Sequence, residues 1–193
     1  MIAQLTGKFL HKTPTQLIVD AGGVGYEVNI SLNTFTDIQQ LESGTLHTFL
    51  KIAEDTHTLW GFSEMAEKQM FIMLIGVSGV GTNTARMMLN SLRPQDIHQT
   101  IMMGDVKRLE AVKGIGKKTA ERLVLELRDK VGKNTIILTN KTASYNTNEA
   151  DALEALVALG IARPTAETAV KKAAAQNAHT TVEELIKQVL KSI

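Results

Sequence analysis

Two short glycine turns, repeated in register, constrain this chain more than any other feature. The first is Gly79-Val80-Gly81 and the second is Gly114-Ile115-Gly116, 35 positions later. Leu, Val, Gly, Gly, Thr and Ala all recur at that offset, and each turn stands between stretches of helical apolar spacing. Because glycine permits positive φ and a close approach of the backbone to a ligand, each copy predicts a helix, a tight turn and a second helix.

The helix after each turn should direct unsatisfied amides and the positive end of its dipole at an anion. The predicted phosphate-binding residues are Gly79, Val80, Gly81, Thr82, Asn83, Gly114, Ile115, Gly116, Lys117 and Lys118. Val80 and Ile115 should also anchor the turns in the helical core. Thr82-Asn83 stands where the second copy has two lysines, so the first turn should bind more weakly or through amides and hydroxyls. Such contacts read no bases, which predicts sequence-independent DNA binding; two tight turns between packed helices remain the alternative.

Neither turn fits a nucleotide-binding loop. A Walker A loop needs lysine and then serine or threonine after its last glycine, but two lysines follow Gly116 and Thr82 follows Gly81. A dinucleotide fingerprint needs a third glycine, and Thr84 and Thr119 occupy that position. We therefore expect no ATP binding through a P-loop and no cofactor.

The net charge of +1 conceals an uneven distribution. Residues 1–63 carry three basic and six acidic side chains, whereas residues 64–133 carry twelve and eight, which places the positive charge in the hairpin segment. The chain has no cysteine, its five histidines lack metal-ligand spacing, and neither a signal peptide nor a membrane span is visible. We expect no metal site, no membrane partner and a cytoplasmic location.

The apolar pattern changes along the chain and predicts a multidomain α+β protein. Residues 1–63 alternate with period two and indicate a five- or six-stranded barrel of the oligonucleotide-binding (OB) type, with a helical or irregular excursion at 33–41. Residues 64–133 have helical spacing and are predicted to form the tandem helix-hairpin-helix domain, in which Asp105 should cap a helix and Gly132 should end the last one. Residues 134–148 are predicted to be a flexible linker, and residues 149–193 a three-helix, UBA-like domain of the kind that binds another protein. Thr181 and Glu184 have the spacing of a capping box before its last helix.

This order of parts resembles the RuvA family over essentially the whole chain. The motifs that carry the resemblance are Met1-Ile2 with Leu5-Thr6-Gly7, Gly22-Gly23-Val24-Gly25-Tyr26-Glu27-Val28, Glu54-Asp55 followed by Trp60-Gly61-Phe62, Gly79-Val80-Gly81, the stretch from Val112 to Arg122, and Ala155-Leu156-Val157-Ala158-Leu159-Gly160. The resemblance implies a homotetramer or octamer that holds four-way (Holliday) junction DNA open. It also implies recruitment of the hexameric ATPase RuvB for branch migration, with the RuvC resolvase as a further partner, and no catalytic set in this chain itself.

The resemblance also assigns roles to single residues. Arg122 joins the phosphate-binding set, Glu54 and Asp55 form an acidic pin at the crossover, and Leu156, Leu159 and Ile161 face RuvB. A solvated polar β-turn is the alternative for the two acids, and the helix-bundle core is the alternative for the two leucines, since their spacing fits either. The sequence departs from many relatives at Ile161, where they have an aromatic residue, and at Thr82-Asn83, where they have proline and a basic residue.

Two other functions fit the hairpins. The chain could be a general helix-hairpin-helix scaffold that binds proteins rather than DNA. It could instead be a repair nuclease subunit in which Glu54 and Asp55 hold Mg²⁺, although no third acid or lysine stands in a matching motif nearby. Junction recognition is the function that the whole pattern favours.

Overall fold

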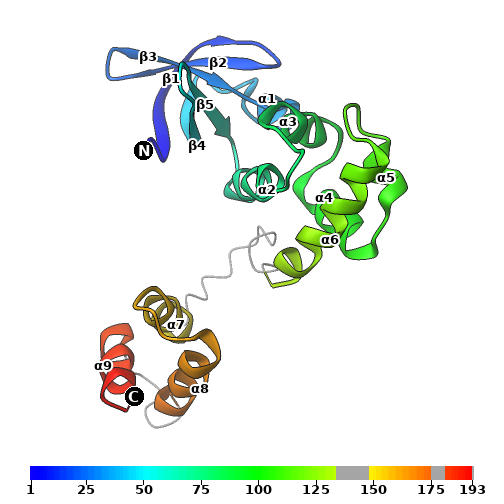
Figure 1. The fold of residues 1–193 in the computed structure, drawn as a ribbon. Helices are drawn as coiled ribbons and strands as arrows, with labels where there is room; N and C mark the ends of the chain where they lie inside the picture. Colours follow the sequence, from blue (N-terminus) through cyan, green and yellow to red (C-terminus); the bar gives the residue numbers. More distant parts are fainter. Residues whose placement is uncertain (134–147, 175–180, 193) are drawn as a thin grey trace. The chain divides into compact units, whose positions relative to one another are not determined.

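The computed structural model describes residues 1–133, 148–174 and 181–192 (Figure 1). They form two compact units, one within residues 1–140 and the other within residues 141–193. Within the described residues, no helix combines the length and the apolar character needed to cross a bilayer.

The N-terminal part of the first unit is a closed five-stranded barrel, as predicted (Figure 1). Its strands are β1 (Gln4–Lys12), β2 (Gln16–Ala21), β3 (Val24–Asn29), β4 (Ser43–Ile52) and β5 (His57–Phe62), in the barrel order β1-β2-β3-β5-β4. All neighbouring strands are antiparallel except β3 and β5. Alternate residues such as Leu17, Val19, Val28 and Leu46 are fully buried inside it, as a half-buried strand pattern requires. The excursion between β3 and β4 is a helix, α1 (Leu32–Ile38).

Up to residue 133, where the description of this unit ends, five helices follow the barrel. They are α2 (Met65–Ile75), α3 (Thr82–Ser91), α4 (Pro94–Met103), α5 (Val106–Glu110) and α6 (Lys117–Lys133). Asp105 caps α5 by accepting a hydrogen bond of 3.1 Å from the Arg108 amide. The prediction that Gly132 ends the last helix was wrong: α6 continues through it, because buried Val131 anchors the final turn and an interior glycine costs only about 1 kcal/mol.

The barrel and the helices share packing where they meet. Trp60 and Phe62 of β5 contact Phe71 of α2, with ring centroids 5.2 and 5.0 Å apart. Both β5 residues belong to the same buried cluster as Val80 and Ile115 of the two glycine turns. The change in sequence pattern near residue 63 therefore does not separate two independent bodies.

The described residues of the second unit form three mutually packed helices, α7 (Asn148–Ala158), α8 (Arg163–Ala174) and α9 (Val182–Ser192). Thr181 and Glu184 form the predicted capping box before α9, with bonds of 3.3 and 3.2 Å between each side chain and the other residue's amide. Most of the predicted linker lies outside the described residues, but its last residue, Asn148, begins α7 and so was wrongly assigned to it.

Candidate nucleic-acid interface

The two glycine turns have the same backbone conformation. Gly79 has φ +91° and Gly114 has φ +93°, the left-handed region that favours glycine. The amide of Val80 donates to the carbonyl oxygen three residues earlier at 3.0 Å, and the amide of Ile115 repeats that bond at 3.1 Å. Both side chains are buried, as predicted, so they hold the turns against the helical core.

Each turn leads directly into a helix with free donors at its start. The first intrahelical bond of α3 runs from Ala85 to Gly81, and that of α6 runs from Ala120 to Gly116, both at 2.9 Å. The amides of residues 82–84 and 117–119 precede those bonds, and no side chain caps α3. Asn83, Lys117 and Lys118 are exposed, whereas Thr82 is partly buried.

The two hairpins lie side by side. Arg122 of α6 donates from Nη1 to the carbonyl oxygen of Ser78, just before the first turn, at 3.4 Å. A Cβ atom on Gly79 would lie 4.0 Å from Oγ1 of Thr119. Arg122 also forms an ion pair with Glu126 at 3.2 Å. Its guanidinium therefore contacts both its own helix and the other hairpin, although the side chain is 52% exposed.

The acidic turn joins β4 to β5. The amide of Ala53 donates to the carbonyl oxygen of Thr56 at 2.9 Å and closes the turn, which leaves Glu54 and Asp55 at its exposed tip. Among the described residues no three histidine or acidic side chains are grouped so that they could hold a metal ion. The arrangement therefore places negative charge at the exposed end of a β-hairpin.

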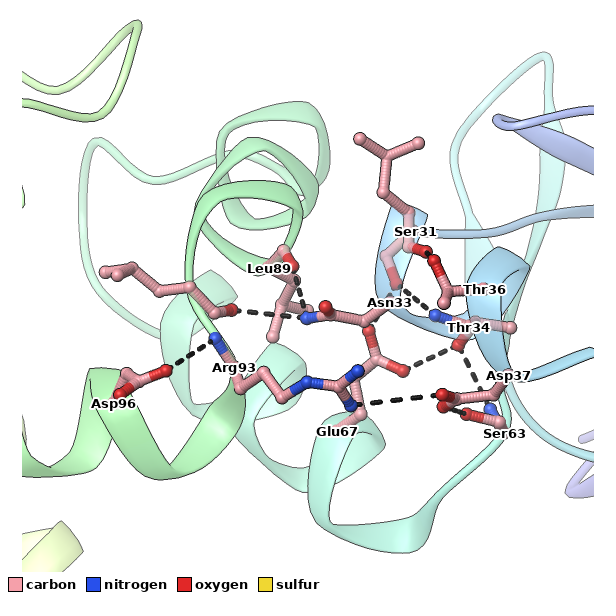
Figure 2. Close-up of polar contacts among 12 residues, drawn as sticks. Ser31, Asn33, Thr34, Thr36, Asp37, Ser63, Glu67, Leu89, Arg93 and Asp96 are labelled. Carbon is pink, nitrogen blue, oxygen red and sulfur yellow. Dashed lines mark hydrogen bonds and ion pairs between the residues drawn. The ribbon is translucent and has the colours of Figure 1, made fainter.

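A buried carboxylate connects the barrel helix α1 to α2 (Figure 2). Glu67 of α2 is 2% exposed and accepts hydrogen bonds from the hydroxyls of Ser31 and of Thr34, the latter at 2.6 Å. Burial raises the pKa of the Glu67 carboxyl above its usual range, and the nearby charges of Asp37 and Glu64 add to that, whereas the two hydroxyl bonds act in the opposite direction.

Further polar bonds tie α1 to the helices that carry the first hairpin (Figure 2). The Asn33 side chain donates to backbone carbonyls at the end of α3, and Asn90 accepts from the Leu32 amide at 2.8 Å. Asp37 accepts from the Ser63 hydroxyl at 2.7 Å and pairs with Arg93 at 3.9 Å. We call this set, with Ser31, Thr34 and Glu67, the α1 clasp. Its bonds fix the barrel relative to the first hairpin.

Sequence reasoning missed the α1 clasp. The available signal was Glu67 itself, an acid inside the apolar stretch of α2 at a position that faces the core. A buried acid needs polar partners, but their identity depends on contacts more than 30 positions away.

The three residues of the second unit that were predicted to face RuvB differ in their burial. Leu156 is fully buried in the three-helix core, and this corrects its assignment as a surface contact. Leu159 is 63% exposed, and Ile161 is partly buried against the same core. Gly160 between them has φ +92° and follows the end of α7, so the chain changes direction before Ile161.

This fold and this site define a tandem helix-hairpin-helix protein with an N-terminal barrel. Three family models match the chain: "RuvA N terminal domain" over residues 1–61, "SAM-like Helix-hairpin-helix tandem" over residues 71–129, and "RuvA, C-terminal domain" over residues 147–193. The chain belongs to the RuvA family.

Curated relatives match over the full length. A protein of Flavobacterium psychrophilum is 45% identical over all of both chains, and one of Christiangramia forsetii is 43% identical over the same share. A protein of Cytophaga hutchinsonii is 43% identical over 99% of both chains. All three are named "Holliday junction branch migration complex subunit RuvA".

Proposed function

We propose that this chain binds four-way junction DNA without sequence preference, as the junction-recognition subunit of a branch migration complex. The observation that carries the proposal is the pair of adjacent hairpins with identical positive-φ turns, each followed by free helix amides. Helix N-termini of this kind bind phosphate oxygens through N–H donors and the helix dipole. The names of the full-length relatives support the choice of a junction as the DNA structure.

The two turns contribute differently to phosphate binding. At the second turn the exposed side chains of Lys117 and Lys118 add cations to the amides of the α6 N-terminus. At the first turn Thr82 and Asn83 provide only amide and hydroxyl groups beside Gly79 and Gly81. Arg122 mainly holds the two turns together through its bond to Ser78, so we expect it to contribute less to phosphate binding than the two lysines do.

The acidic turn acts by repulsion in this proposal. In a homotetramer with fourfold symmetry, or an octamer of two such rings, Glu54 and Asp55 of four copies surround the crossover. Carboxylates this close to phosphates raise the energy of strands that approach the axis, so they keep the junction open. Exposure of both side chains at a hairpin tip supports this role.

The chain itself performs no catalysis in this proposal. The second unit, 149–193, recruits RuvB, whose ATP hydrolysis drives migration, and exposed Leu159 with partly exposed Ile161 supplies the contact. The segment 134–148 provides the tether, and the RuvC resolvase acts on the same junction. We place the complex in the cytoplasm.

The test is a binding titration of the full chain with a synthetic four-way junction and with a linear duplex of matched sequence. We expect tighter binding to the junction, and affinity that falls steeply with salt, because each neutralised phosphate releases counterions.

The double variant Lys117→Gln with Lys118→Gln should weaken binding to all sequences alike. Lys171→Gln with Lys172→Gln, the same charge change in the second unit, is the control. Equal affinity of the wild-type chain for junction and duplex would overturn the proposal. Mg²⁺-dependent cleavage would indicate a nuclease instead.

A further inference from the structure

Arg86 of α3 is held in place by an aromatic ring of the barrel. Its guanidinium carbon lies 5.6 Å from the ring centroid of Trp60, which is only 3% exposed. The Nε atom of Arg86 is enclosed without a hydrogen-bond partner in the described part of the chain, although the side chain as a whole is partly exposed. Stacking on a buried indole therefore orders this long side chain, which stays partly exposed.

Arg86 has no acidic partner among the residues that the structure describes. Three other arginines of the hairpin segment lie within ion-pair distance of carboxylates: Arg93 at 3.9 Å, Arg108 at 3.7 Å and Arg122 at 3.2 Å. Across the described residues, no carboxylate lies within 4.0 Å of the Arg86 guanidinium. An ordered cation without an acid is available for an anionic ligand.

The position of Arg86 on α3 directs that cation toward the first glycine turn. Arg86 follows Thr82 by four residues, so the two lie on the same flank of the helix. Because helical side chains lean toward the N-terminus, we expect the guanidinium to lie toward the end of α3 that presents free amides. The first turn has no lysine where the second has two, and Glu121 occupies the position equivalent to Arg86 in the second hairpin.

We propose that Arg86 is a further phosphate contact, which supplies the first hairpin with the cation that Thr82-Asn83 lack. This inference rests on the proposed DNA binding and names an additional residue for it. The planar guanidinium can donate two parallel hydrogen bonds to phosphate oxygens. Because Trp60 already orders the side chain, binding loses less rotamer entropy than it would with a free arginine. The ligand is the DNA backbone, so the contact reads no base.

The experiment measures the salt dependence of junction binding for the full chain and for Arg86→Gln. We expect weaker binding and a slope of log K against log salt that is shallower by about 0.9 for each phosphate that the variant no longer neutralises. The reduction in affinity should be the same for two junctions of unrelated sequence. Arg86→Lys keeps the cation and should retain the wild-type slope. Lys172→Gln in the second unit makes the same charge change and should have no effect.

Two results would overturn the inference while leaving junction binding intact. One is an Arg86→Gln slope and affinity equal to those of Lys172→Gln, although the wild-type chain still prefers the junction. The other is dissociation of the oligomer by Arg86→Gln in sedimentation velocity, which would make the Arg86–Trp60 pair part of a subunit interface. Absence of junction preference in the wild-type chain, in contrast, is failure of the proposed function itself.

A measurement on the wild-type chain covers the case in which Arg86→Gln does not fold. Phenylglyoxal modifies accessible guanidinium groups, and mass spectrometry locates the modified arginines. Bound junction DNA should protect Arg86 and leave the modification of exposed Arg163 in the second unit unchanged. Equal modification of Arg86 with and without DNA would overturn the inference.

Discussion

At the residue scale, Glu67 is the side chain on which most buried polar bonds between barrel and hairpins depend. Glu67→Ala leaves the hydroxyls of Ser31 and Thr34 without their acceptor and opens a cavity, so we expect a decrease of about 3 kcal/mol in the free energy of unfolding. Glu67→Gln keeps the volume and one acceptor and should cost about 1 kcal/mol. Trp60 is the only tryptophan, so its fluorescence in urea titrations reports the first unit alone. Exposed Glu42→Ala is the control, and an equal effect of Glu42→Ala and Glu67→Ala would refute the assignment.

The raised pKa of Glu67 also predicts how stability depends on pH. Between the pKa of a glutamate in the unfolded chain, about 4.3, and the higher pKa in the folded protein, the folded state binds more protons. The contribution of Glu67 to stability is therefore complete at low pH and declines as the pH rises through that window. We expect the stability difference between wild type and Glu67→Gln to shrink from acid to neutral pH in urea titrations. A difference that grows with pH would show that the hydroxyl bonds dominate over burial.

At the element scale, each hairpin needs its two glycines for different reasons. Gly114 has φ +93°, so Gly114→Ala should destabilise the first unit by about 1 kcal/mol through backbone strain. Gly116 is not in the left-handed region, and a Cβ there would have open space around it, so Gly116→Ala should leave the thermal midpoint unchanged. If a phosphate approaches this backbone, Gly116→Ala should still weaken junction binding. Thermal melts with parallel binding titrations separate the two effects, and equal changes in both variants would contradict this division of roles.

The same scale shows what the sequence could predict. The barrel strands, the two hairpins, the Asp105 cap and the Thr181–Glu184 capping box depend on local periodicity and turn chemistry, so they were predicted correctly. Leu156 and Leu159 share a helical spacing that suits a core or a surface, and only the packed bundle shows that the first is buried and the second exposed. The α1 clasp could not be predicted, because its bonds join residues that are distant in the sequence.

At the scale of the whole molecule, the α1 clasp and the shared aromatic packing make the acidic turn and the hairpins parts of one body. The hairpins are proposed to attract phosphates, whereas the turn is proposed to repel them. Both actions require a fixed distance between the acidic turn and the hairpins, since a turn that moved freely could move away from the DNA strands. β5 begins beside the acidic turn, and Trp60 and Phe62 lie at its other end. These two residues pack against α2, and this packing fixes the turn relative to the helices.

The final prediction tests the acidic turn in that assembled body. Glu54→Gln with Asp55→Asn removes charge from exposed side chains, so the urea midpoint should not change. Junction affinity should stay the same or rise, because the variant no longer repels the phosphates. Fluorescence energy transfer between labelled arms should at the same time show a less open junction. Asp151→Asn with Glu183→Gln, the same charge change in the second unit, is the control and should alter neither quantity. Weaker junction binding by the turn variant would mean that the two acids attract a group on the DNA or a partner, and repulsion would have to be abandoned as the role of this turn.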